Sequence, residues 1–287
     1  MELVSIIIVN YNSFDYTYKC IKSIIDKTKD ISYEVIVVDN ASTDFNKRKL
    51  EDLSPSVKVI ENIENLGFAK ANNIGIQYSN SDVILLLNND TLLLNDAISK
   101  CYNKLKEDKS IGTIGCKLFN EDLTWQKSFY EFPTLKSQFR KLFRIKGRPV
   151  YDDSSNYVHW LTGAFLMFRK SSLQLFEEKK LKEDFFMYCE DIQWGMQFKK
   201  VGLNNFYYPK GQIVHYQGKS STFQDDFSKK QKYYYPNLFI LIWKEFNLVY
   251  AYTYFLLEII VRISTFKLKY WYTILPLSKV MLKHHKK

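Results

Sequence analysis

A run of five apolar residues, Val83–Leu87, ends abruptly at the polar sequence Asn88-Asn89-Asp90. An unbroken apolar run of this length is typical of a strand that is buried on both faces, as in the middle of a parallel sheet. In open α/β sheets, ligands bind where the strands end at their carboxyl edge. Asp90 is therefore predicted to lie where a metal ion or a phosphate group is bound.

Short apolar runs alternate with helical patterns through the first 110 residues. Strands are predicted at 4–9, 35–38, 57–60 and 83–87. One helix follows Asn12 or Ser13 as its cap, a second follows the turn that begins at Asn65, and a third is capped by Asn95. This alternation predicts an α/β fold with a doubly wound, mostly parallel sheet.

Each predicted strand ends in polar residues. Right-handed crossovers would bring the segments 10–12, 39–44, 62–67 and 88–90 to one edge of the sheet. Any one of these segments is equally well explained as a turn, because Asn, Asp, Ser and Gly are turn residues. Because all four segments come directly after buried strands, their convergence favours a binding site.

In the second half of the chain, the residue pattern predicts strands at 111–119, 159–169 and 212–215. It also predicts a helix from Glu190-Asp191 to near Gly202. Gly163 interrupts the second of these strands, which usually marks a bulge or a close approach by backbone or ligand. The Glu190-Asp191 pair is the best candidate for a general base in this half, and the alternative is stabilisation of the helix dipole. His215 is either a metal ligand or a core histidine.

The net charge of +10 over 287 residues favours an anionic partner. The four cysteines have no C-x-x-C spacing, which argues against a disulfide framework or a zinc site and is typical of a reducing cytosolic compartment. The amino terminus is interpreted as a first strand, because it lacks the basic region of a signal peptide.

Two segments are basic and aromatic. Residues 134–149 carry six cations and no acid, and the chain from Lys229 onward becomes aromatic and increasingly basic. Such segments fit an anionic membrane surface, or else pack on the domain or on a second subunit. The apolar run 246–257 is too short to span a bilayer. The chain is therefore divided into a domain at 1–225 and a helical tail at 226–287.

Several motifs occur in a familiar order. They are Val-Ser-Ile-Ile-Ile-Val-Asn-Tyr-Asn from Val4, Val-Val-Asp-Asn-Ala-Ser-Thr-Asp from Val37, Asn-Leu-Gly-Phe-Ala-Lys-Ala-Asn-Asn-Ile-Gly from Asn65, Leu-Leu-Asn-Asn-Asp from Leu86, Trp-Leu-Thr-Gly-Ala from Trp160, Glu190-Asp191, and His-Tyr-Gln-Gly-Lys-Ser from His215. Together they resemble the family 2 glycosyltransferases, and within that family the rhamnosyltransferase-like branch. The resemblance covers residues 3–222.

The resemblance implies a GT-A fold and an inverting transfer by single displacement. The donor would be a nucleoside-diphosphate sugar, such as dTDP-rhamnose or a UDP-sugar, with Mg²⁺ or Mn²⁺ as cofactor. The acceptor would be a hydroxyl of a surface polysaccharide or a lipid-linked glycan. Together with the cysteine pattern and the basic, aromatic segments, the resemblance leads us to expect a cytoplasmic enzyme on the inner face of the cell membrane, acting in polysaccharide biosynthesis for the cell envelope, with no nucleic-acid partner. The alternative is that the tail contacts a second copy of the chain and forms a homo-oligomer.

The family's donor-site roles transfer to positions of this chain. Tyr11 would stack on the donor base and Asp39 would hydrogen-bond it, while Asn65 and Asn72 line the nucleotide pocket. Asp90 matches the last acid of the family's D-x-D, which binds the metal that bridges the diphosphate. His215 resembles a further metal or diphosphate ligand.

The family's acceptor-side roles transfer likewise. Trp160, Gly163 and Ala164 would line the sugar and acceptor pocket. Asp191 matches the catalytic base, and Glu190 is its neighbour and the alternate base. Such a base would remove the proton of the acceptor hydroxyl as its oxygen attacks the anomeric carbon.

The chain departs from the family pattern at two positions. Asn88 replaces the first acid of the D-x-D, so one metal or ribose contact is neutral. Gln193 stands where many relatives carry an acid two residues past the base, which bears on how the acceptor is oriented.

Two other functions are weighed. A nucleotidyltransferase also uses a doubly wound sheet and metal, but it normally has a glycine-rich loop near the first strand. Gly218-Lys219-Ser220 does not form a P-loop motif, because position 213 is Ile where the first glycine is required. A non-catalytic membrane-binding or nucleic-acid-binding module on a transferase scaffold is opposed by the retained acids Asp90 and Asp191.

Overall fold

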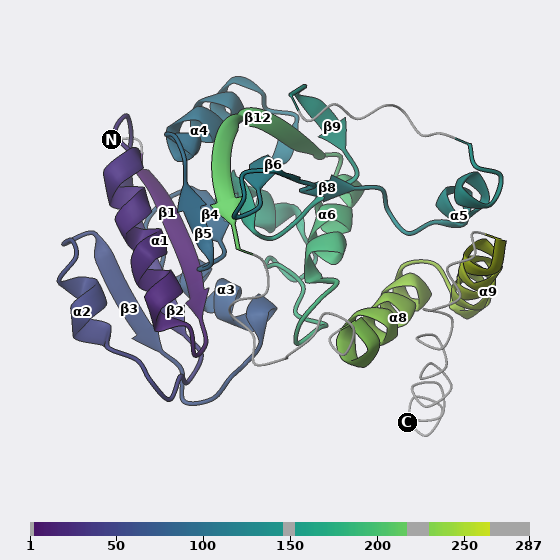
Figure 1. Ribbon diagram of the computed structural model, residues 1–287, viewed down its shortest axis with the longest axis horizontal. Helices are drawn as coiled ribbons and strands as arrows, with labels where there is room; N and C mark the ends of the chain where they lie inside the picture. The colour runs from purple at the N-terminus through teal and green to yellow at the C-terminus, as the bar shows by residue number, and fades with distance from the viewer. Residues whose placement is uncertain (1–2, 146–152, 217–229, 265–287) are drawn as a thin grey trace. The chain divides into compact units, whose positions relative to one another are not determined.

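The computed structural model describes residues 3–145, 153–216 and 230–264 (Figure 1). The chain divides into two compact units. Unit 1 comprises Met1–Tyr130, Tyr151–Phe186 and Glu190–Thr222, and unit 2 comprises Glu131–Val150, Met187–Cys189 and Phe223–Lys287.

Unit 1 is built on one large sheet. Its main path runs, in spatial order, through β3 (Val57–Glu61), β2 (Ser32–Asp39), β1 (Leu3–Asn10), β4 (Val83–Leu87), β11 (Phe165–Arg169), β6 (Ile111–Phe119), β12 (Asn204–His215) and β5 (Thr91–Leu93). The first four strands pair in parallel, and so do β6 and β12, whereas β11 and β5 are antiparallel to their neighbours. The predicted doubly wound, mostly parallel sheet is confirmed.

Three short strands complete unit 1. β7 (Trp125–Gln126) pairs with β6, and β9 (Asn156–Val158) pairs with β12. A separate ribbon joins β8 (Phe129–Tyr130) to β10 (Trp160–Leu161).

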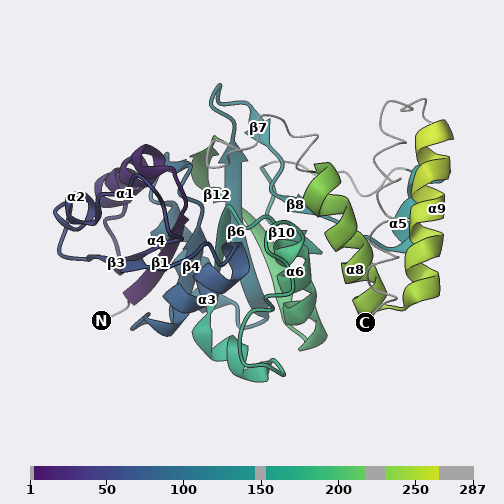
Figure 2. The same ribbon diagram turned by 90° about the horizontal axis from the view of Figure 1, so that it is seen from below.

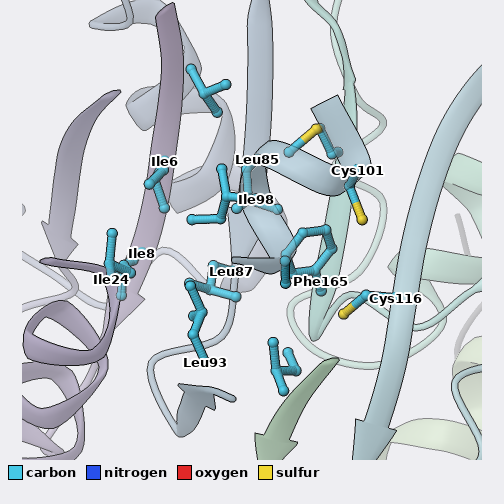
Figure 3. Close-up of a cluster of buried hydrophobic side chains, with 14 of the residues drawn as sticks. Ile6, Ile8, Ile24, Leu85, Leu87, Leu93, Ile98, Cys101, Cys116 and Phe165 are labelled. Carbon is cyan, nitrogen blue, oxygen red and sulfur yellow. The ribbon is translucent and has the colours of Figure 1, made fainter. Parts of the chain in front are cut away.

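Helices cover both faces of the sheet because successive residues of a strand point to opposite faces. On one face Ile6 and Ile8 pack in a core shared with α1 (Phe14–Lys27), α2 (Lys47–Glu51) and α4 (Ala97–Glu107), part of which is shown in Figure 3. On the other face Ile7 belongs to a core that includes α3 (Phe68–Gln77) and α6 (Glu190–Lys200). Figure 2 shows α3 and α6 together on that side.

The structure corrects the predicted strand 159–169. It consists of β10 and β11, because Trp160 and Leu161 pair with β8 while Phe165–Arg169 pairs with β4 and β6. Residues 162–164 connect the two strands, so Gly163 lies in a break and not inside a strand.

Two smaller expectations also change. The cap of α4 is Asp96, whose side chain accepts from Ser99 N, whereas the Asn95 amide donates to the Lys210 carbonyl. The short strand β5 was not expected from the sequence. It pairs with the end of β12, which begins eight residues earlier than the predicted strand at 212–215.

Unit 2 is helical. It contains α5 (Leu135–Leu142), α8 (Tyr235–Glu245) and α9 (Leu248–Ser264), and the π-helical turn Lys230–Tyr234 leads into α8. The short 3-10 helix Lys170–Leu175 belongs to unit 1. The Gln138 side chain donates to Glu258 Oε2 at 2.7 Å, which links α5 to α9. Three predictions fall partly outside the described residues: the basic segment at 146–149, the motif from His215 at 217–220, and the tail at 226–229 and 265–287. Among the helices that the structure describes, none combines the length and apolar character needed to cross a membrane.

Candidate active site

The polar strand ends meet at one edge of the sheet, as predicted. Asn10 Nδ2 donates to Asp39 Oδ1 at 2.7 Å, which joins the ends of β1 and β2. Asn62 Nδ2 donates to Asn40 Oδ1 at 2.8 Å, which joins the ends of β3 and β2. Asn89 Nδ2 lies 3.3 Å from Asn10 Oδ1 and adds the end of β4. The convergence therefore rests on direct side-chain hydrogen bonds.

Three hydrogen bonds hold the Asp39 carboxylate. Its Oδ1 accepts from Asn10 and from Ser42 Oγ at 2.6 Å, and its Oδ2 accepts from the Ser42 backbone N–H at 2.9 Å. It is buried. Tyr11, the next residue after Asn10, is half-buried at the same edge. The two residues expected to contact the donor base are thus close in the fold.

The expected pocket residues Asn65 and Asn72 flank the start of α3. Asn65 Oδ1 accepts from Gly67 N at 3.0 Å, and Asn72 Nδ2 donates to the Phe68 carbonyl at 2.9 Å. Gly67 has φ +83°, and a Cβ built on it would lie 2.5 Å from the Phe186 carbonyl oxygen. That carbonyl accepts from Phe68 N at 3.0 Å, so this glycine allows the chain before α6 to approach α3.

Asp90 is buried directly after β4, and its Oδ1 has no hydrogen-bond partner among the residues that the structure describes. His215, at the end of β12, places Nε2 3.4 Å from that oxygen. Asn88 Nδ2 lies 3.3 Å from the same ring nitrogen. The structure thus brings together Asn88, Asp90 and His215, which are separated by 127 residues at their extremes.

These residues fit a divalent cation. A buried carboxylate oxygen without a partner costs free energy unless a cation or a donor faces it. Two ligands in adjacent octahedral positions about 2.1 Å from Mg²⁺ lie roughly 3 Å apart, close to the separation of Asp90 Oδ1 and His215 Nε2. Within the described residues, no three His, Cys, Asp or Glu side chains gather as a complete metal cage. A cation here would therefore need further ligands from a substrate or water.

A second acidic centre stands at the start of α6. Burial, and then the charge of Asp191, raise the pKa of Glu190 to about 8. Burial also raises the pKa of Asp191 to about 6, opposed by the backbone N–H groups of Ile192 and Gly163. At neutral pH Glu190 therefore holds a proton while Asp191 is largely ionised, which suits Asp191 as a proton acceptor.

Residues 163–164 connect the two centres. Gly163 N–H donates to the Asp191 carboxylate, and the Ala164 carbonyl accepts from Asn88 N at 3.1 Å. Gln193 is buried, and its amide donates to Asp184 Oδ2 at 2.6 Å, so an acid faces this side chain.

An aromatic pair lies near Asp191. Trp160 stacks on Tyr130 with ring centroids 4.9 Å apart, and the charge of Asp191 contributes to raising the pKa of Tyr130 after the larger effect of burial. A Cβ on Gly195 of α6 would lie 2.6 Å from Trp160 Cβ. The absence of a Cβ at position 195 therefore allows Trp160 to pack closely against α6.

Three residues of this site have no individual role in the prediction from sequence, although Asn89 lies in the predicted converging segment 88–90. Asn89 donates to Ser13 Oγ at 2.7 Å and to Thr17 Oγ1 at 3.0 Å, holding the end of β4 to α1. Tyr130 and Gln126 come from the short strands after β6. Only Asn89, inside a motif, carried a sequence signal.

The sequence profile described as Glycosyl transferase family 2 matches residues 5–176, more than half of the chain. The chain belongs to this family and is a glycosyltransferase.

Characterised relatives agree with this assignment. Rhamnosyltransferase WbbL of Escherichia coli (strain K12) is 27% identical over 230 residues, covering 75% of this chain and 83% of WbbL. Glycosyltransferase GlyG of Streptococcus pneumoniae serotype 4 is 28% identical over 242 residues, covering 70% of this chain and 78% of GlyG. The low-salt glycan biosynthesis hexosyltransferase Agl10 of Haloferax volcanii is 27% identical over 210 residues, covering 71% and 64%.

A solved structure shares the fold. The crystal structure of GalNAc-T7 with UDP, GalNAc and Mn²⁺ superposes with a TM-score of 0.60 at 13% sequence identity, covering 85% of this chain and 49% of that one. The predicted GT-A fold is confirmed.

Proposed function

We propose that this chain transfers a sugar from a nucleoside-diphosphate sugar to a hydroxyl of a glycan acceptor, with inversion at the anomeric carbon. The observation that carries the proposal is the pair of acidic centres joined through residues 163–164. One centre offers a cation site at the sheet edge, and the other offers an ionised carboxylate near an open aromatic pair. The similarity to WbbL supports a deoxyhexose such as rhamnose as the sugar.

The transfer needs one base and no protein nucleophile. Asp191 accepts the proton of the acceptor hydroxyl while that oxygen forms a bond to the anomeric carbon. The bond between that carbon and the diphosphate oxygen breaks at the same time, and the nucleoside diphosphate leaves with the electron pair. Glu190, neutral at pH 7, adds no second negative charge beside the base.

Asp90 and His215 are proposed to hold a divalent cation, Mg²⁺ or Mn²⁺. Such a cation supplies neutralisation of the charge that develops on the leaving diphosphate. Tyr11, Asp39, Asn65 and Asn72 are proposed to bind the nucleoside.

The donor test uses the whole chain with Mn²⁺, a panel of nucleoside-diphosphate sugars and lipid-linked glycan acceptors. The linkage of the product is read by NMR. Transfer from one donor with an inverted anomeric configuration is expected. Retention of configuration would contradict the single-displacement mechanism, and release of free sugar alone would contradict the acceptor assignment.

We also propose that unit 2 binds an anionic membrane surface, where a lipid-linked acceptor would be met. Every exposed residue of α9 except the terminal Ser264 is apolar: Val249, Tyr252, Leu256, Ile260 and Ile263. The charged residues of α9, Glu258 and Arg262, pair with each other at 2.8 Å.

Charge on α5 favours a membrane over other occupants. This helix and the residues after it expose cations beside apolar side chains: Lys136, Phe139, Lys141, Phe143, Arg144 and Ile145. Apolar and basic side chains on one helical unit are typical of interfacial binding to anionic lipids.

Vesicle co-sedimentation tests this. Binding to vesicles that contain phosphatidylglycerol is expected, with weaker binding to phosphatidylcholine alone and to the double variant Leu256→Ser, Ile260→Ser. A parallel sedimentation measurement of the free protein detects a second copy on this face. A dimer with no lipid binding would contradict the proposal.

A further inference from the structure

The side chain of Gln126 contacts His215 on the side of the ring that faces away from Asp90. Gln126 belongs to β7, which pairs with β6 at Leu118, and β12 pairs with β6 at the same residue through Ile213. The register of β6 therefore brings Gln126 beside His215. Gln126 Oε1 lies 2.7 Å from His215 Nδ1, and Gln126 Nε2 lies 3.1 Å from the His215 carbonyl oxygen.

The backbone carbonyl decides how the Gln126 amide is oriented. A carbonyl oxygen only accepts hydrogen bonds, so the group that faces the His215 carbonyl must be the amide NH₂. The same NH₂ donates to Asn120 Oδ1 at 2.8 Å, which supports this orientation. The amide oxygen is then the atom that faces His215 Nδ1.

The amide orientation in turn decides the tautomer of His215. An amide oxygen has no hydrogen to donate, so Nδ1 must carry the hydrogen of this 2.7 Å contact. A neutral imidazole has one N–H, and Nε2 therefore carries a lone pair and no hydrogen. That lone pair belongs to the atom 3.4 Å from Asp90 Oδ1, for which the described part of the chain offers no hydrogen-bond partner.

Asn88 matches this arrangement. Its Nδ2 lies 3.3 Å from His215 Nε2 and donates to the lone pair. An aspartate at position 88 would instead offer an acceptor to Nε2 and favour the opposite tautomer. The neutral residue in the first D-x-D position is thus compatible with a histidine that presents a lone pair.

We propose that Gln126 is a positioning residue for the cation site: it holds His215 in the Nδ1–H tautomer, so that Nε2 and Asp90 present two ligand atoms toward one point. Partners that orient a metal-binding histidine typically change metal affinity by 10–100-fold when they are removed. The inference rests on the cation site of the proposed function, but its first test requires neither metal nor substrate.

The first test is the tautomer of His215 in the metal-free chain. Long-range ¹H–¹⁵N NMR of ¹⁵N-histidine protein, at roughly two pH units above the ordinary histidine pKa of about 6.5, distinguishes the protonated nitrogen. His215→Asn assigns the resonances. The parent is expected to show a protonated Nδ1 and a bare Nε2. A protonated Nε2 in the parent would overturn the proposal.

Two substitutions at Gln126 separate positioning from packing. Gln126→Met keeps the length of the side chain but has no amide, and it should shift His215 toward the Nε2–H tautomer. Gln126→Glu retains an acceptor for Nδ1 and should keep the parental tautomer. The proposal fails if Met leaves the tautomer unchanged, or if Glu changes it as much as Met does.

The second test is the Mn²⁺ affinity in the absence of substrate, measured by electron paramagnetic resonance. Gln126→Met should weaken Mn²⁺ binding roughly 10- to 100-fold, and Gln126→Glu should weaken it less. Asn120→Ala removes the other partner of the amide and serves as the matched control, with a smaller effect. Unchanged Mn²⁺ affinity in Gln126→Met contradicts the proposal. If the affinities change as expected but the parent transfers no sugar, the proposed function fails and this inference stands.

Discussion

The two acidic centres of unit 1 use carboxylates in opposite ways. At the end of β4, one oxygen of Asp90 lacks a hydrogen-bond partner within residues 3–145, 153–216 and 230–264, and it lies 3.4 Å from a histidine nitrogen. At the start of α6, burial raises the pKa of both Glu190 and Asp191. The first arrangement is suited to binding a cation, whereas the second determines which of the two carboxyl groups holds a proton. Burial alone therefore does not define the role of an acid. The groups that face the carboxylate determine whether it binds a cation or holds a proton.

The largest effect is expected from removing the proton acceptor. Asp191→Asn keeps the size of the side chain but cannot accept the acceptor proton, so transfer should fall roughly 10²- to 10⁴-fold. Initial rates at saturating donor measure this. Glu190→Gln is the matched control, since a neutral amide imitates a protonated carboxyl, and it should stay within about threefold of the parent at pH 7. A large loss in Glu190→Gln with a mild loss in Asp191→Asn would exchange the two roles.

The pH profile sharpens the same centre. Because the pKa of Asp191 is raised to about 6, the carboxylate is protonated below that pH and no longer accepts a proton. The transfer rate is therefore expected to fall as the pH decreases through about 6. A profile that stays flat down to pH 4.5 contradicts a raised pKa at the base.

The next largest effect is expected at the cation site. Asp90→Ala removes one of the two proposed protein ligands, and transfer should drop roughly 100-fold at a fixed, low Mn²⁺ concentration. Excess Mn²⁺ should restore part of the rate. Asp30→Ala, an exposed acid, is the control and should leave the Mn²⁺ dependence unchanged. Equal Mn²⁺ dependence in Asp90→Ala and the parent would remove the cation from this site.

A smaller effect is expected from Gly163→Ala, between the centres. The added Cβ would lie 3.4 Å from Phe68 Cε1 and 4.0 Å from Asp191 Cβ, which are ordinary contacts, so the fold should persist. The methyl group narrows the space beside the base, and the acceptor KM should rise roughly 3- to 10-fold. Mn²⁺ affinity serves as the internal control and should not change. A parallel loss of Mn²⁺ affinity would show that the two centres are not separable.

The smallest effect concerns stability. The pKa of Glu190 is raised in the folded state, so the folded chain holds this proton between the ordinary pKa of about 4.5 and about 8, where the unfolded chain has lost it. This group therefore lowers the free energy of unfolding as the pH rises through that window. Glu190→Gln should gain thermal stability relative to the parent as the pH goes from 5 to 8. A Tm difference that does not depend on pH contradicts the raised pKa.

The binding edge of the sheet is predictable from the sequence because it depends on local patterns: an apolar run for each strand and polar residues directly after it. The run Val83–Leu87 coincides with β4, and polar strand ends on parallel strands must meet once the crossovers are right-handed. The Asp90–His215 pair was recognised from motifs, and the structure places the two side chains together.

The remaining features depend on contacts between distant residues. Gln126 meets His215 across 89 residues only because β7 and β12 share β6 as a neighbour. The break at Gly163 arises because β10 pairs with β8, whereas β11 pairs with β4 and β6. The space for Phe186 at Gly67 is equally a tertiary contact. No local pattern of residues encodes these arrangements.

The most direct test of the division between the two centres is the affinity of Asp191→Asn for a nucleoside-diphosphate sugar in the presence of Mn²⁺, measured by calorimetry on the preparation whose transfer rate is known. The donor affinity should stay within about twofold of the parental value while transfer is lost, because the cation site is intact. Parental transfer, or a collapse of Mn²⁺-dependent donor binding in this variant, would contradict separate roles for Asp90 and Asp191.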